Sequence, residues 1–127
     1  MFRIDDDKTI HITRGDIGII EASFDNDENE PRTFTSGDLV RFQVYPKRHH
    51  ENVVLSKDVL IESETQFVEF VLERSDTKLG EIINKPVVYW YEVELNPDTA
   101  PQTLIGYDDN GPKQFILYPE GGDRIEY

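Results

Sequence analysis

The chain has 127 residues and a mass of 14.8 kDa, which suits one domain, and its lack of cysteine excludes disulfide bonds and cysteine-ligated metal centres. Thirteen Lys and Arg residues against 26 Asp and Glu residues give a net charge of −13, which repels nucleic acid and anionic membranes. The sequence has neither an apolar run of transmembrane length nor a signal-peptide pattern at its start, so we expect no membrane partner.

Apolar side chains recur at every second residue in most segments, which indicates strands rather than helices. The first two predicted strands are residues 9–13 and 17–24, joined by a turn at Arg14-Gly15-Asp16. This tripeptide can be an adhesion ligand, but Gly suits a positive φ and Asp can cap its own turn, so we interpret it as a turn. One face of the second strand is predicted to point inward; it carries Gly18, Ile20, Ala22 and Phe24.

The middle of the chain predicts three more strands. Residues 25–38 lack periodicity and are expected to form an exposed acidic loop, and residues 39–45 form a strand that ends at Pro46. Residues 53–61 and 66–72 are then predicted to pair as a hairpin through residues 62–64.

The last third begins with a single predicted helical turn over Lys78 and Leu79, capped by Ser75, Asp76 or Thr77 and closed by Gly80. Residues 87–95 show the strongest strand pattern and should be central, with Trp90 half covered on the outer face. Two further strands are predicted at residues 102–107 and 114–118, with a turn at residues 108–111 between them.

These elements predict an all-β, antiparallel, immunoglobulin-like sandwich of seven or eight strands with at most one short helical turn. A partly open barrel is the alternative. Residues 1–118 form the single domain, and residues 119–127 form a C-terminal tail. The predicted core consists of Phe42, Val44, Phe70, Leu72, Tyr89, Tyr91, Val93 and Phe115.

Motifs for metal binding and catalysis do not reach their required spacing. Residues 5–7 and 25–30 are rich in oxygen ligands, but position six of an EF-hand counted from Asp25 is Glu30 where glycine is required. His49 and His50 diverge as neighbours and lie far from His11, so we expect exposed histidines and no metal.

No nucleophile elbow, cysteine–histidine pair or phosphate-binding glycine loop is present in the sequence. Glu92 or Glu94 could belong to a carboxylate pair for glycoside hydrolysis, but with 26 acidic residues some pair always looks suitable. We therefore expect no enzymatic activity and no cofactor.

Several motifs occur together in a recurrent order: residues 10–16 (Ile-His-Ile-Thr-Arg-Gly-Asp), 36–44 (Ser-Gly-Asp-Leu-Val-Arg-Phe-Gln-Val) and 89–95 (Tyr-Trp-Tyr-Glu-Val-Glu-Leu). A strand around Thr103 and the segment 115–117 before Pro-Glu-Gly complete the pattern. From about residue 8 to residue 121 the chain resembles the small β-sandwich domain of tailed-phage and prophage structural proteins, similar to the N-terminal domain of upper baseplate proteins.

The resemblance implies a non-catalytic assembly module of a phage or prophage tail or baseplate, located in the virion and assembled in the host cytoplasm. Its partners would be other phage structural proteins or further copies of the chain. Candidate partner-binding residues are Ile125 and Tyr127, two apart in the tail, and Trp90. The alternative is a carbohydrate-binding module that uses Trp90 and outward aromatics such as Tyr45.

Overall fold

The computed structural model describes residues 1–23, 33–46, 52–107 and 111–120. Within these ranges the chain forms nine strands and one helix of four residues, α1 (Arg74–Thr77). The strands are β1 (Phe2–Ile4), β2 (Ile10–Thr13), β3 (Gly18–Ser23), β4 (Leu39–Tyr45), β5 (Leu55–Leu60), β6 (Phe67–Leu72), β7 (Val87–Leu95), β8 (Gln102–Ile105) and β9 (Lys113–Tyr118). The prediction of an all-β chain with one short helical segment is confirmed for the described residues.

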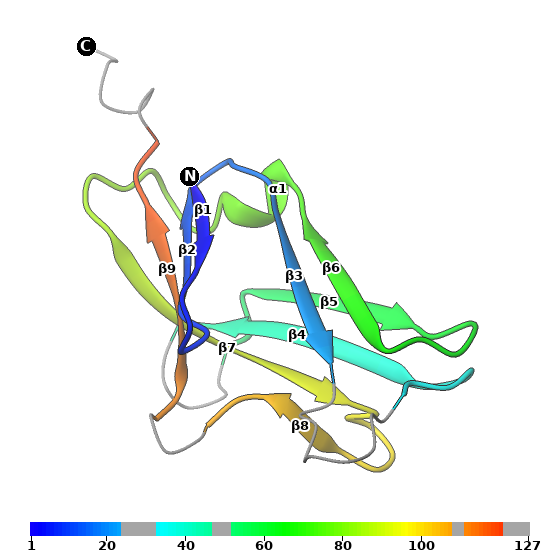
Figure 1. The fold of residues 1–127 in the computed structure, drawn as a ribbon. Helices are drawn as coiled ribbons and strands as arrows, with labels where there is room; N and C mark the ends of the chain where they lie inside the picture. The colour runs from blue at the N-terminus through cyan, green and yellow to red at the C-terminus, as the bar shows by residue number, and fades with distance from the viewer. Residues whose placement is uncertain (24–32, 47–51, 108–110, 121–127) are drawn as a thin grey trace.

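The strands form two sheets of unequal size. The larger sheet has the order β1-β2-β9-β7-β4-β5, with β8 paired to β7 beyond β9, and the smaller sheet is the antiparallel pair β3-β6. In Figure 1, β1, β2 and β9 stand upright while β4 and β5 run across the view, so the larger sheet curls between its two edges. The strand β7 has three partners, which confirms its predicted central place.

One aromatic side chain, Phe42 on β4, lies at the centre of the core. Its ring centroid is 5.8 Å from that of Phe70 on β6, 5.6 Å from that of Tyr91 on β7 and 6.5 Å from that of Phe115 on β9. Phe70 belongs to the smaller sheet and the other two rings to the larger one, so this cluster joins the sheets. The tilted geometry of such pairs adds to the gain from apolar burial.

The predicted core is confirmed at seven of its eight positions, which are at most 3% exposed. They alternate with exposed or half-buried neighbours along β6 and β9, as the two-residue period requires, whereas Tyr45 on β4 and Glu92 on β7 are buried neighbours on the other face. Tyr89 is the exception, because it is only partly buried and packs against the edge of the core.

The prediction of a strictly antiparallel arrangement of seven or eight strands is wrong. The strands β2 and β9 run parallel, with Ile10 opposite Phe115, and the described part of the chain has nine strands. The extra strand is the short β1, which pairs antiparallel with β2. After β2 the chain turns toward the smaller sheet, which leaves the edge of β2 open for the C-terminal strand arriving in the same direction.

The predicted hairpin between residues 53–61 and 66–72 is also wrong. β5 pairs with β4 in the larger sheet, whereas β6 pairs with β3 in the smaller one. The residues between them cross from sheet to sheet, held by backbone hydrogen bonds from the Ile61 N–H to the Asp38 carbonyl (2.8 Å) and from the Phe34 N–H to the Thr65 carbonyl (2.8 Å). A period of two residues shows which face is buried, but not which strand lies alongside.

The helical turn between the sheets begins earlier than predicted. It spans residues 74–77 rather than Lys78 and Leu79, because the Asp76 carboxylate accepts a hydrogen bond from the Glu73 N–H (2.8 Å) and fixes the first turn there. The helix ends at Thr77, and Gly80 follows three residues later with a φ of 65°. The segment crosses from β6 in the smaller sheet to β7 in the larger one.

Replacing Tyr91 with alanine is expected to lower the free energy of unfolding by about 3 to 5 kcal/mol, because the substitution removes a buried ring from the Phe42 cluster. It also leaves the Lys8 carbonyl without the hydrogen bond that the Tyr91 hydroxyl donates (2.6 Å). Urea titration measures the loss. Tyr107, which is 77% exposed, is the control, and its alanine variant should change stability by less than about 0.5 kcal/mol. A loss below about 1 kcal/mol for Tyr91→Ala would contradict the assigned core.

Candidate interaction surface

The predicted exposed loop histidines, His49 and His50, lie outside the described residues. His11 lies on β2, within the predicted strand 9–13, and is buried. Its Nε2–H donates to Asp5 (2.7 Å), and its Nδ1 is hydrogen-bonded to the Tyr118 hydroxyl (2.7 Å). These bonds fasten the turn after β1 to β2 and β9. The hydrogen bond from His11 and the nearby Arg3 lower the pKa of Asp5.

The acidic segment 5–7 is engaged in local structure. Asp5 accepts from His11 and Arg3, and Asp7 accepts from the Thr9 N–H at 3.0 Å, which lowers the pKa of Asp7. Within the described ranges, no group of three or more His, Asp or Glu side chains is arranged to hold a metal ion. The other acidic segment, residues 25–30, lies outside the described residues.

The turn interpretation of Arg14-Gly15-Asp16 is confirmed. The Asp16 N–H donates to the Thr13 carbonyl (2.9 Å), and Gly15 has a φ of 88°. Arg14 is only 9% exposed and donates from Nη2 to the Gly80 carbonyl (3.1 Å), while Asp16 pairs with the terminal ammonium group of Met1. The Arg14 and Asp16 side chains are therefore both engaged in contacts within the chain.

The outer face of the larger sheet carries Trp90, with Tyr45 directly opposite on β4. Trp90 is half-buried as predicted, but Tyr45 is 3% exposed and its hydroxyl donates to Gln43 at 2.8 Å. The two rings therefore do not form an open platform of the kind on which sugars stack. The other candidate partner-binding residues, Ile125 and Tyr127, lie outside the described residues.

Beside Trp90 on the same face, Glu92 and Glu94 are hydrogen-bonded to each other. Burial raises the pKa of Glu92 to about 7, and the hydrogen bond and charge of Glu94 add to this effect. Glu92 and Glu94, each of which the sequence offered as one member of a carboxylate pair, thus lie together on this face.

The rest of this outer face is also paired internally. Arg41 forms ion pairs with Asp58 (2.8 Å) and Asp98 (3.3 Å), and these carboxylates raise the pKa of the guanidinium group. Gln43 Nε2 donates to Ser56 on β5 (3.4 Å). Arg41 and Gln43 on this face therefore already have partners within the chain.

The smaller sheet presents a different surface. Its inward side chains are buried, while its outward residues are Ile19, Glu21 and Ser23 on β3 and Phe67, Glu69 and Val71 on β6. We call this set the β3–β6 outer face. Ile19, Val71 and Phe67 are each 46 to 48% exposed, and Ile17 just before β3 is 59% exposed. Exposed apolar side chains gathered on one small sheet are typical of a protein-binding surface.

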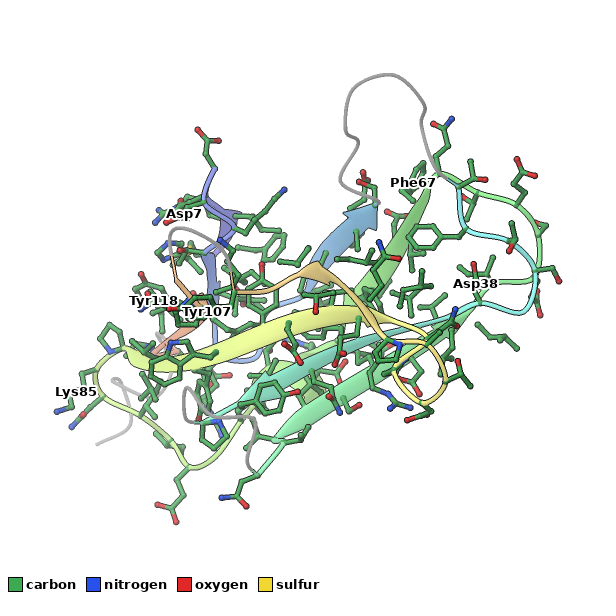
Figure 2. The ribbon with its side chains drawn as sticks, turned by 90° about the horizontal axis from the view of Figure 1, so that it is seen from below. Asp7, Asp38, Phe67, Lys85, Tyr107 and Tyr118 are labelled. Carbon is green, nitrogen blue, oxygen red and sulfur yellow. The ribbon has the colours of Figure 1, made fainter. Side chains whose placement is uncertain are left out.

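A hollow of about 240 Å³ continues this face toward β5. Its lining includes Phe67 at the start of β6 and Leu60, which is 60% exposed, at the end of β5. Figure 2 shows Phe67 at the opposite end of the molecule from Tyr118 and Lys85. The hollow is wide enough for one large apolar side chain of a partner.

This surface is not among the sites predicted from the sequence, although its signal is visible in the chain. Ile17 and Ile19 lie out of phase with the buried face of β3, and Phe67 and Val71 lie out of phase with that of β6. Out-of-phase apolar residues in a strand indicate either a second buried face or a binding face. Only the pairing of β3 with β6 brings them onto one surface.

Comparison with known proteins identifies no relative: no family model, no curated protein and no solved structure matches the chain. No helix in the described part of the chain is both long and apolar enough to cross a membrane.

Glu92→Gln is expected to remove a pH dependence of stability. The folded state favours the protonated carboxyl group of Glu92. The contribution of this group to the free energy of unfolding is therefore full below the ordinary pKa of 4.5, and it is lost as the pH rises through about 7. The variant should therefore match the wild type in mild acid and exceed its unfolding free energy by roughly 2 kcal/mol at about pH 8.

Urea titrations at several pH values test this, with Glu81→Gln at an exposed site as the control. An equal difference between Glu92→Gln and the wild type at all pH values would contradict the assigned role of Glu92.

Proposed function

We propose that the chain is an immunoglobulin-like sandwich that acts without catalysis, as a structural and assembly module of a phage or prophage tail or baseplate. It works through contacts with other structural proteins of the virion, which are assembled in the cytoplasm of the bacterial host. The sequence resemblance supports the virion setting, and the surface geometry supports binding to other proteins.

The strand neighbours support the sandwich. In immunoglobulin-like domains the second strand pairs with the fifth in one sheet, and the third, sixth and seventh strands form the other. Counting β2 as the first strand, with β5 as the fourth and the short β8 left out, this chain pairs the second strand, β3, with the fifth, β6, and places the third, sixth and seventh, β4, β7 and β9, side by side. The fourth strand, β5, lies at the edge of the larger sheet. The larger sheet of this arrangement also gains β1 and β8.

The observation that carries the binding role is the β3–β6 outer face. Ile19 and Val71 are directly opposite in register and nearly half exposed, so they form an apolar pair open to solvent. Covering such side chains is favourable by about 25 cal/mol for each Å² of apolar area removed from water. Within the described residues, β3 and β6 pair with no other strand, so both outer edges are also available for strand addition.

The double variant Ile19→Ser/Val71→Thr is expected to keep the fold but weaken association with tail and baseplate proteins of the same phage or prophage. Both side chains point away from the core, so the unfolding free energy should change by less than about 1 kcal/mol. Light scattering of the co-expressed proteins after gel filtration measures the association.

Ile82→Ser is the matched control, because Ile82 is 64% exposed and lies outside this face. A second part of the experiment uses a variant that lacks residues 121–127. This variant keeps Glu120, because the Glu120 carboxylate lies near Arg14 and Lys78. Association that survives the double variant unchanged would contradict the assigned surface, and turnover of a bacterial-surface glycan by the wild type would contradict the non-catalytic role.

A further inference from the structure

Two glutamates oppose each other at the centre of the β3–β6 outer face. Glu21 and Glu69 are Cα partners in the antiparallel register, and both side chains are exposed. Like charges directly opposite on neighbouring strands repel each other and destabilise the sheet. Neither side chain forms an ion pair with another described residue of the chain. A positive charge between them would relieve this repulsion.

Apolar side chains flank the glutamates on both sides. Ile19 and Val71 are the adjacent pair on one side, and Ser23 and Phe67 are the adjacent pair on the other. Successive pairs on one face of a sheet are about 7 Å apart, which is also the spacing of alternate side chains in an extended segment. Along the face, aliphatic side chains are therefore followed by acidic ones and then by an aromatic one. Their spacing matches that of alternate side chains in an extended strand laid over the face.

We infer that the β3–β6 outer face binds an extended segment of another protein that carries a Lys or Arg between two apolar side chains, each two residues away. The basic group lies between Glu21 and Glu69. One apolar side chain packs on Ile19 and Val71, and the other packs on Phe67 and reaches the hollow beside Leu60. This inference rests on the proposed function and specifies the chemistry of the partner.

A second copy of the chain does not meet these requirements. Two copies packed through the same face would bring four glutamates together, in a chain whose net charge is already −13. This repulsion opposes self-association and leaves the surface free for a basic partner. The negative charge of the chain also attracts such a partner toward the surface.

The tail of the chain does not fit either. Its sequence Asp-Arg-Ile-Glu-Tyr, residues 123–127, alternates so that an extended strand has Ile125 and Tyr127 on one face and Arg124 and Glu126 on the other. The basic group then points away from the apolar ones, and a glutamate accompanies it. A tail bound to another sheet would thus use a different surface from this one.

The test titrates the full chain with the peptide acetyl-Ser-Ile-Thr-Lys-Thr-Phe-Ser-amide and follows backbone amide signals by nuclear magnetic resonance. A second peptide has glutamate in place of lysine, and a third has lysine moved by one position so that it faces away from the apolar residues. We expect shifts confined to β3, β6 and the hollow, saturable only with the first peptide. Comparable binding of all three peptides, or no binding of the first, would overturn the inference.

The variant Glu21→Lys separates charge recognition from general damage to the fold. It places a lysine opposite Glu69, which should raise the melting temperature while weakening binding of the first peptide by about tenfold or more. Glu81→Lys makes the same charge change at an exposed site outside the face and should leave binding within about twofold. Equal effects of the two variants on binding would overturn the inference.

Failure of this inference is distinguishable from failure of the proposed function. If the peptide does not bind but association with the neighbouring tail proteins still requires Ile19 and Val71, the partner chemistry is wrong and the assembly role stands. Sedimentation of the wild-type chain alone measures its oligomeric state. If the wild type is a dimer and the Ile19→Ser/Val71→Thr variant is a monomer, a second copy of the chain occupies the surface, and the inference is overturned.

Discussion

The contact of Phe42 with three other aromatic rings is the interaction on which the rest of this structure depends. The smaller sheet has only two strands, and its hydrogen bonds run between β3 and β6. An isolated pair of strands is marginally stable in water, so this sheet depends on packing against the larger one. The Phe42–Phe70 contact, 5.8 Å between centroids, lies at the centre of that packing.

Polar contacts at the rim of the core fix the segments that connect the strands. Arg14 reaches the Gly80 carbonyl, and the Gly15 N–H donates to Thr77 Oγ1 (2.9 Å), so the turn after β2 is fastened to the segment after β6. At another point, the Leu39 N–H donates to Asn96 Oδ1 (2.9 Å). These contacts fix the connections from within the chain and do not involve the β3–β6 outer face.

The two outer faces differ in how far their groups are paired within the chain. On the larger sheet, Arg41 lies between two carboxylates and Glu92 is hydrogen-bonded to Glu94. On the smaller sheet, Glu21 and Glu69 face each other between exposed apolar side chains. A surface whose charges repel and whose apolar groups are exposed gains free energy when a complementary partner covers it, whereas a paired surface gains little. This contrast is why the smaller sheet is assigned as the interaction surface.

The sequence by itself determined the all-β class, the positions of eight of the nine described strands and nearly all of the predicted core, because burial on one face imposes a period of two on each strand. It also determined the turn at residues 14–16 from the conformational needs of Gly15. Only the tertiary structure decided that β2 runs parallel to β9, that β5 and β6 belong to different sheets, and that Glu21 lies opposite Glu69. The physical reason is that periodicity describes one strand at a time, whereas the neighbour of each strand depends on how distant segments pack around Phe42.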